Sequence, residues 1–512
     1  MIKKRLLFCL LMAAPSLSFA TDLIEVYNQA LSSDQIYQQA ISQRLSTREG
    51  VPISIAQLLP NINLTANPAV TRTAYSGANV SGPTAFSPRN NTARSYDLAL
   101  TLNQTVFNYG QFAGVASALA TAKGADATLN AALQSLMTRV ASAYFAVLRD
   151  EENLSYSEAS KIAYAEQLDQ VKQQFDVGLK TITDVYTAQA SYDSSVADYI
   201  SAQTLLANDR ENLRVITGTY YPHLAALSED FPLISPKPAN IDEWVNTSLT
   251  QNWSIKASQY SVASAKDIIH EQISGHLPTV SLQGTLDRQY DININGYPNA
   301  MDQRQGPSTQ TDRVVQLNFN VPIFSGGGVT AEVNQATYNY QLAQQQLEQT
   351  RRNTINSTRQ NYLGVIAGIS KIMADKQTVK STISSLEGME ESYKVGTETL
   401  VDVLNQQQKV FQAQTQYATD RYAFVNSYLA LKQAAGTLSF NDLSAINGWL
   451  HEQPSKSAMH QFSYHSHKKV EHLKPKSVAL ITPSVKHLKV AMKKLNAHKL
   501  IAKMKKHTKT LA

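Results

Sequence analysis

The chain repeats one pattern at a spacing of about 218 residues, and this duplication restricts its fold more than any other feature. The clearest pair of segments is FDVGLKTITDV at 175–185 and YKVGTETLVDV at 393–403. At the same spacing, LPNI at 59–62 recurs as LPTV at 277–280. A repeat of this length indicates one structural plan used twice. We therefore expect two halves that form the same elements in the same order.

Composition and charge divide the chain into a signal peptide, two repeats joined by a linker, and a tail. Residues 1–20 place basic residues before an apolar stretch and end in small residues, as a secretory signal peptide does. We expect the first structural repeat at 21–230, a proline-containing linker at 231–240 and the second repeat at 241–445. The tail at 446–512 holds 14 Lys against two Glu, so its net charge of +12 exceeds the +6 of the whole chain. The excess of basic residues therefore lies in this tail, which we expect to be disordered. We expect no specific nucleic-acid binding.

Each half contains two segments in which apolar and polar residues alternate, as in strands with one apolar face. The four predicted strands lie at about 61–72, 96–107, 279–289 and 313–324. Such strands suit a transmembrane barrel with lipid on one side and water on the other, although a soluble sheet with one wet face has the same pattern. Four strands are too few to close a barrel, so a pore requires several chains.

The remaining sequence is rich in Ala, Gln, Ser and Asn and runs for long distances without proline. The predicted helices lie at about 22–57, 111–174, 183–217, 241–273, 329–393 and 400–436. A 64-residue helix is about 96 Å long and needs partners along its whole length, so antiparallel hairpins packed side by side are expected. No stretch after the signal peptide is apolar enough to predict a helical membrane span.

No pattern of catalytic or cofactor-binding residues is present in the sequence. The single cysteine, Cys9, lies in the predicted signal peptide, which removes cysteine-based metal sites and nucleophiles from the mature chain. The glycines at 326–328 are not followed by the Lys-Ser/Thr of a phosphate-binding loop, and they indicate a tight turn from strand to helix. We expect no cofactor, no metal site and no enzymatic activity.

Taken together, these features resemble the TolC-like outer-membrane efflux proteins. The resemblance rests on two halves of strand, loop, strand and helical hairpin, on VPIFSGG at 321–327, and on the hairpin tip at 393–404. It implies a mixed α and β membrane protein in which a homotrimer forms a twelve-stranded outer-membrane β-barrel, four strands per chain, continued by a long periplasmic α-helical barrel.

The resemblance also implies a function. Members of this family act as passive exit ducts of tripartite efflux pumps or type I secretion systems in the outer membrane of Gram-negative bacteria. The implied partners are outer-membrane lipid, a periplasmic adaptor protein, and an inner-membrane transporter of the RND or ABC type.

The residues of the periplasmic gate follow from the same resemblance. The tip of the second hairpin closes the entrance in this family, with acidic residues just after the turn. Asp402 occupies the first acidic position, whereas the second is Asn405 here, so three chains give three carboxylates instead of six. Asp402 and Asp184 also follow Thr at the spacing of a helix-capping box. The alternative interpretation of both residues is therefore that they stabilise the starts of helices.

Carrying over the family's closing contacts identifies further residues at the tips. An Asp at the position of Asp184 and a Tyr at that of Tyr393 are joined in the family by a basic residue, but that position is Glu398 here. Lys180 is the repeat equivalent of Glu398, so we hypothesise that Lys180 and Glu398 pair with exchanged polarity. Gly178 and Gly396 are the predicted turn glycines of the two tips.

One competing interpretation belongs to another class of protein. A non-conducting periplasmic coiled coil, either structural or adhesive and anchored in the outer membrane, also uses long helices of this composition. The alternating strands and the duplicated tip favour the channel.

Overall fold

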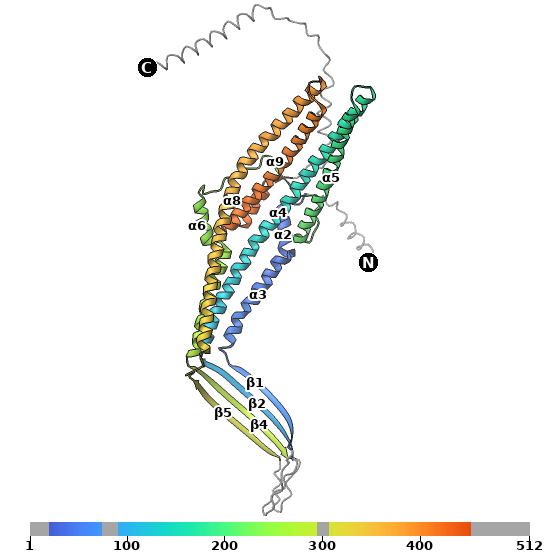
Figure 1. Ribbon diagram of the computed structural model, residues 1–512. Helices are drawn as coiled ribbons and strands as arrows, with labels where there is room; N and C mark the ends of the chain where they lie inside the picture. The colour runs from blue at the N-terminus through green and yellow to red at the C-terminus, as the bar shows by residue number, and fades with distance from the viewer. Residues whose placement is uncertain (1–19, 74–90, 294–306, 452–512) are drawn as a thin grey trace, which may run out of the picture. The chain divides into compact units, whose positions relative to one another are not determined.

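The computed structural model describes residues 20–73, 91–293 and 307–451, and these form a four-stranded antiparallel sheet, a small two-stranded sheet and a set of long helices (Figure 1). The predicted signal peptide, except for its last residue, lies outside the described residues. So do most of the predicted tail and most of the two loops between paired strands.

Four strands form the sheet in the order β1-β2-β4-β5, and every neighbouring pair is antiparallel. Their bounds are Asn61–Thr73 (β1), Asn91–Phe107 (β2), Thr279–Asn293 (β4) and Ser308–Asn320 (β5). The hairpin of each half joins the other through the β2–β4 pairing. Strands β2 and β5 begin five residues earlier than the alternation predicts. Residues 91–95 and 308–312 are mostly polar on both faces, so the alternating pattern does not extend to the first residues of these strands.

Two hairpins of long helices continue the chain from the sheet (Figure 1). They comprise α4 (Tyr109–Asp176) with α5 (Ile182–Thr217), and α8 (Gly328–Lys394) with α9 (Leu400–Ala434). At about 1.5 Å per residue, the 68 residues of α4 span about 100 Å. One stretch of α4 is apolar enough to cross a membrane by length and composition, but half of it is buried inside the protein, as expected for a helix that packs against other helices.

Two of the expected helices are each interrupted once, which corrects the predicted ranges 22–57 and 241–273. The first is divided into α2 (Leu23–Ser33) and α3 (Gln35–Ala56), and the second into α6 (Ile241–Gln251) and α7 (Trp253–Ile273). The breaks lie at Asp34 and Asn252, which are themselves 218 residues apart. Each side chain accepts backbone hydrogen bonds at the start of the following helix, because Asp and Asn are strong N-caps.

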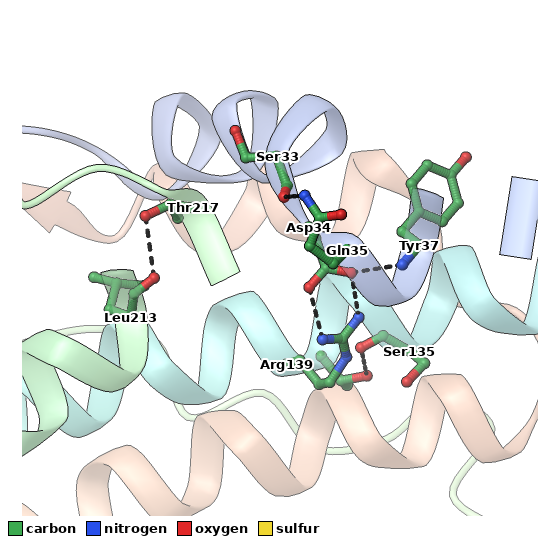
Figure 2. Close-up of polar contacts among 9 residues, drawn as sticks. Ser33, Asp34, Gln35, Tyr37, Ser135, Arg139, Leu213 and Thr217 are labelled. Atoms are coloured by element: carbon green, nitrogen blue, oxygen red, sulfur yellow. Dashed lines mark hydrogen bonds and ion pairs between the residues drawn. The ribbon is translucent and has the colours of Figure 1, made fainter. Parts of the chain in front are cut away.

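The first break is also an ion-pair site (Figure 2). Asp34 is 3% exposed, and its carboxylate accepts hydrogen bonds from Nη1 and Nη2 of Arg139 on α4 at 2.8 and 2.9 Å. Burial alone raises the pKa of this carboxyl, but the hydrogen bonds from Arg139 and from the backbone N–H of Tyr37 outweigh burial and leave the pKa below its usual value. The bidentate pair therefore fixes the α2–α3 junction on α4.

The largest apolar core joins α2, α4, α5 and α9 part of the way along the long helices. We call it the central core, and its largest fully buried members include Tyr144, Phe145, Leu213, Phe424 and Leu429. Helix α10 (Phe440–Asn447) adds Leu443 and Ile446 to it, and β6 (Leu450–His451) pairs with β3 (Ala226–Leu227) beside it. Residues 446–451 thus belong to the folded body, which moves the start of the tail beyond the predicted residue 446.

Candidate functional site at the hairpin tips

Both long hairpins turn at a glycine that adopts a left-handed backbone conformation. Gly178 has φ 79° between α4 and α5, and Gly396 has φ 82° between α8 and α9. Such φ values strain any residue with a Cβ, so glycine is needed at both turns. The neighbouring Val177, Leu179 and Val395 are 70–76% exposed, which leaves apolar side chains on both tips without cover from their own chain.

After each turn, a threonine and an aspartate form a complete capping box. Asp184 Oδ2 accepts hydrogen bonds from the backbone N–H of Thr181 at 2.9 Å and from its hydroxyl at 2.8 Å. Asp402 Oδ2 accepts the same two bonds from Thr399. The backbone and side-chain hydrogen bonds from Thr181, with a smaller contribution from Lys180, hold the pKa of Asp184 below its usual value. Both carboxylates therefore stabilise helix starts, as the alternative interpretation predicts.

The capping bonds do not hide Asp402 from solvent. Its side chain is partly exposed on the first turn of α9, and Asn405 is exposed one turn later. On another face of the same turns, Leu400, Val403 and Leu404 are buried. One Asp402 carboxylate per chain is thus fixed at the start of α9, and Asn405 adds an uncharged amide.

A small group of residues, here the tip cluster, packs the second hairpin against the first near these turns. Its buried members are Tyr164, Leu168, Val171, Ala188, Leu400 and Leu404, with Val185, Tyr192 and Tyr393 partly buried around them. The Tyr164 hydroxyl donates a hydrogen bond to the Leu404 carbonyl at 3.2 Å. Burial and the nearby Asp198 raise the pKa of Tyr164 to about 12, so this hydroxyl keeps its proton and remains a donor.

Lys180 lies at the edge of the tip cluster, but its contact differs from the hypothesised one. Lys180 Nζ is 4.4 Å from the centroid of the Tyr393 ring, a cation–π contact between the two hairpins of one chain. Glu398 is exposed, and within the described ranges of a single chain no ion pair joins it to Lys180. The Tyr393 hydroxyl is buried and has no hydrogen-bond partner among the described residues of the chain. The structure thus brings Lys180 and Tyr393 together within one chain.

Farther from the tips, a buried arginine joins three segments. Arg421 on α9 is 3% exposed, and its Nη1 lies 3.3 Å from the Glu152 carboxylate of α4. Its Nη2 donates to the carbonyls of Leu227 and Ser228 at 3.1 Å, in the segment that links the two halves. We call these contacts the Arg421 junction. Sequence reasoning missed it, because a lone Arg in a helix is normally solvated and the partners come from distant segments.

The sheet places every acidic side chain of its strands on one face. Register and alternation put these carboxylates on the same face as Thr65, Thr101 and Gln316. They are Asp97, Asp287, Asp291 and Asp312. We call this the polar face of the sheet. The sequence indicates the polar face of each strand, since each Asp has the parity of the polar positions in its strand. The register was needed to show that these faces align across the sheet.

Across the described part of the chain, no group of three or more His, Cys, Asp or Glu side chains is arranged to hold a metal ion.

The comparisons with known proteins agree with this architecture. The family model described as "Outer membrane efflux protein" matches residues 26–219 and 244–437, one match in each half. The outer membrane protein TolC of Escherichia coli is 36% identical over 438 residues, covering 85% of this chain and 86% of that protein. TolC of Vibrio cholerae is 34% identical over 432 residues, covering 84% of this chain and 94% of that protein.

Two further comparisons extend the range of relatives. The alkaline protease secretion protein AprF of Pseudomonas aeruginosa is 26% identical over 84% of this chain and 87% of its own length. The crystal structure of the Campylobacter jejuni CmeC outer membrane channel superposes with a TM-score of 0.67 at 18% identity, covering 86% of this chain and 89% of that one, which shows the shared fold. On these matches and the duplicated strand-and-hairpin plan, the chain belongs to the outer membrane efflux protein family.

Proposed function

We propose that this protein is the outer-membrane exit duct of a tripartite efflux pump or a type I secretion system, and that it works as a homotrimer. Its relatives are named as TolC, as an alkaline protease secretion protein and as an outer membrane efflux protein, which supports both kinds of export. The duct conducts passively, because the chain offers no phosphate-binding loop to couple ATP. Three copies contribute four strands each to one twelve-stranded barrel.

The observation that carries this proposal is the pair of unlike faces on an open sheet. One face is polar and acidic, while the other exposes Leu64, Val315 and Phe319 to the extent of about two thirds or more of their surface. Within the part of the chain that the structure describes, strands β1 and β5 pair on one side only, so each has a free edge. Unpaired edges are costly in lipid, and closure with neighbouring copies removes them while enclosing the polar face around water.

The helical tips supply the docking site for the periplasmic adaptor in this proposal. Val177, Leu179 and Val395 expose apolar side chains around two turns that face open space. The adaptor would cover these side chains and connect the duct to an inner-membrane transporter of the RND or ABC type.

The same region contains the gate. Three copies of Asp402 form a ring of three carboxylates, and Asn405 forms a neutral ring one turn away. Two charges about 8 Å apart in water repel by only about 0.5 kcal/mol, so one ring accommodates three carboxylates, which favour cations. Asp184, Lys180 and Tyr393 hold the tips in the closed position through the capping boxes and the tip cluster, and Glu398 is left to pair with a neighbouring copy.

Conductance through a planar lipid bilayer tests this proposal. We expect the native trimer to open small, stepwise currents that a trivalent cation blocks from one side only. Asp402→Ala should keep the currents and weaken the block by at least tenfold. Asp184→Ala removes an equivalent capping carboxylate from the other tip, so it should raise the frequency of opening but leave the trivalent-cation block unchanged, which makes it the control for the block.

Each result separates the alternatives. An unchanged block in Asp402→Ala would reduce Asp402 to a helix cap while keeping the duct. If no current appears under any condition, the non-conducting periplasmic stalk becomes the better description. The proposed duct and the proposed gate would then both be rejected.

A further inference from the structure

Every arginine in the described strands lies on the apolar face of the sheet. Register and alternation give these residues the parity of Leu64, Leu100 and Val315, opposite to the polar face. They are Arg72, Arg94, Arg288 and Arg313, and we call them the arginine band. All four are exposed. The described strands carry no acidic residue on this face, so cations and carboxylates are fully separated across the thickness of the sheet.

Along the strand registers, the arginine band runs diagonally from β1 to β5 towards the helices, and it adjoins a pair of tyrosines. Tyr96 faces Tyr290 across the β2–β4 pairing, with ring centroids 6.3 Å apart. Arg94 is the next residue on the same face of β2 towards the loops, and Arg288 is the next on β4 towards the helices. Aromatic rings beside cations, at the end of an apolar surface, are typical of the boundary between lipid tails and headgroups.

The length of the apolar surface agrees with that position. From Tyr96 to Val106 the strand advances ten residues, or about 34 Å at 3.4 Å per residue. With strands tilted by about 40°, this corresponds to a height of about 26 Å, close to the apolar band of an outer-membrane barrel. Because the helices adjoin the other end of the strands, the arginine band lies at the boundary farther from them, on the outer side of the membrane.

The internal duplication predicts how the arginine band continues between copies. Strand β5 matches β2 in sequence at a shift of 217 residues, and β4 matches β1 at a shift of 218. Transferring the β2–β4 register to the seam between β5 of one copy and β1 of the next places Arg313 opposite Arg72 of the neighbouring copy. These arginines occupy the positions that Tyr96 and Tyr290 hold within a chain. Two cations facing each other directly destabilise a sheet unless an anion lies between them.

We propose that the arginine band binds the phosphate groups of lipids in the outer leaflet of the outer membrane. The planar guanidinium of Arg donates two parallel hydrogen bonds to a phosphate, and the adjoining apolar surface accommodates the acyl chains of the same molecule. At the seam, one phosphate neutralises two arginines from different copies, so the lipid also joins the copies. The seam contact rests on the proposed trimer, whereas binding by a single chain rests only on the sheet.

Lipid binding to the purified full-length protein in detergent tests this inference by native mass spectrometry. The probes are lipid A, whose glucosamine headgroup carries phosphate monoesters, its enzymatically dephosphorylated form, and phosphatidylcholine. We expect lipid A to bind the native protein at least tenfold more tightly than the dephosphorylated form. Replacing all four arginines by Gln should abolish that preference, since each basic residue near an anionic surface changes affinity by about fivefold.

A matched variant removes the same number of positive charges from the helices. Lys123, Lys172, Lys266 and Lys380 are exposed residues of α4, α7 and α8, and their replacement by Gln should leave lipid binding unchanged. An all-lysine version of the arginine band should show intermediate binding, because it keeps the charge but loses the paired donors. If the glutamine version fails to assemble, the all-lysine version still tests the inference, because its binding can be compared with that of the native protein.

Two results would overturn the inference: equal binding of lipid A and its dephosphorylated form to the native protein, or an unchanged preference in the glutamine version. Conductance of the same variants separates this test from that of the duct. A variant that loses lipid A but conducts normally supports the inference, and a protein that binds lipid A without conducting contradicts only the proposed function.

Discussion

The central core and the tip cluster connect the same long helices, but they do so with very different contacts. In the central core, large aromatic and aliphatic side chains from several helices are almost fully buried, and Arg421 links α9 to α4 and to the segment between the two halves. In the tip cluster, six buried side chains, one tyrosine hydrogen bond and one cation–π contact hold the hairpins together. About 33 Å of α9 separates Arg421 from Thr399. The hairpins are thus anchored far from their tips and lightly held at the tips, an arrangement that suits the proposed gate because its tips can move without unfolding the body.

Breaking the Arg421 junction should have the largest effect on stability. Arg421→Ala leaves the partly buried Glu152 carboxylate without its cation, with the Tyr422 hydroxyl as its remaining donor, and it also removes the bonds to the Leu227 and Ser228 carbonyls. We therefore expect the free energy of unfolding to fall by about 3 kcal/mol. Urea unfolding followed by the helical circular dichroism signal measures this loss. Arg352→Ala, which removes an exposed ion pair with Glu348, should change stability by less than about 0.5 kcal/mol. Similar losses in both variants would show that the central core does not anchor the helices.

The Asp34–Arg139 pair should have the next largest effect, and its effect should depend on pH. Asp34→Asn keeps the helix cap but loses the charge, so we expect a loss of about 2 kcal/mol at pH 7. Because folding lowers the pKa of this carboxyl, its contribution is complete above the unfolded pKa of about 4 and is lost as the pH falls through the folded pKa. The difference between native and variant proteins should therefore shrink below about pH 4. A constant difference from pH 7 to pH 3 would contradict this assignment.

At the tips, removing one cap should change the gate more than the body. Thr399→Ala deletes half of the second capping box, at a cost of about 1 kcal/mol to the start of α9. We expect more frequent opening in bilayer recordings and an almost unchanged urea midpoint. Thr181→Ala, the equivalent change in the first hairpin, is the comparison, and an equal rise in opening would mean that both hairpins move.

The smallest effect should come from the cation–π contact. Lys180→Gln removes the charge above the Tyr393 ring, and such contacts at exposed sites contribute about 0.5–1 kcal/mol. We expect a two- to fivefold rise in open probability, with Lys180→Arg close to native. Glu398→Gln separates this contact from an ion pair between Lys180 and Glu398 of neighbouring copies. If Glu398→Gln raises the open probability as much as Lys180→Gln does, the ion pair between copies is the better explanation.

Sequence alone predicted the large elements because their signals are local. Alternation located all four strands, and the absence of proline located α4, α5, α8 and α9 to within a few residues. The breaks at Asp34 and Asn252 were missed, although both are strong N-caps at equivalent repeat positions, because the apolar pattern continues across them. The contact between Lys180 and Tyr393 and the Arg421 junction depend on how distant helices pack, which no local pattern encodes. The arginine band required the strand register.

The β2–β4 pairing makes each chain an internal dimer of two hairpin modules. The proposed closed trimer would have pseudo-sixfold symmetry, in which one backbone plan repeats around the axis while the chemistry differs from one module to the next. The Tyr96–Tyr290 pairs would alternate with the proposed arginine seams, and tips with Lys180 would alternate with tips that have Glu398 at the equivalent position. Because the two modules of one chain differ in sequence, a ring built from identical chains would carry two chemically distinct sets of tips.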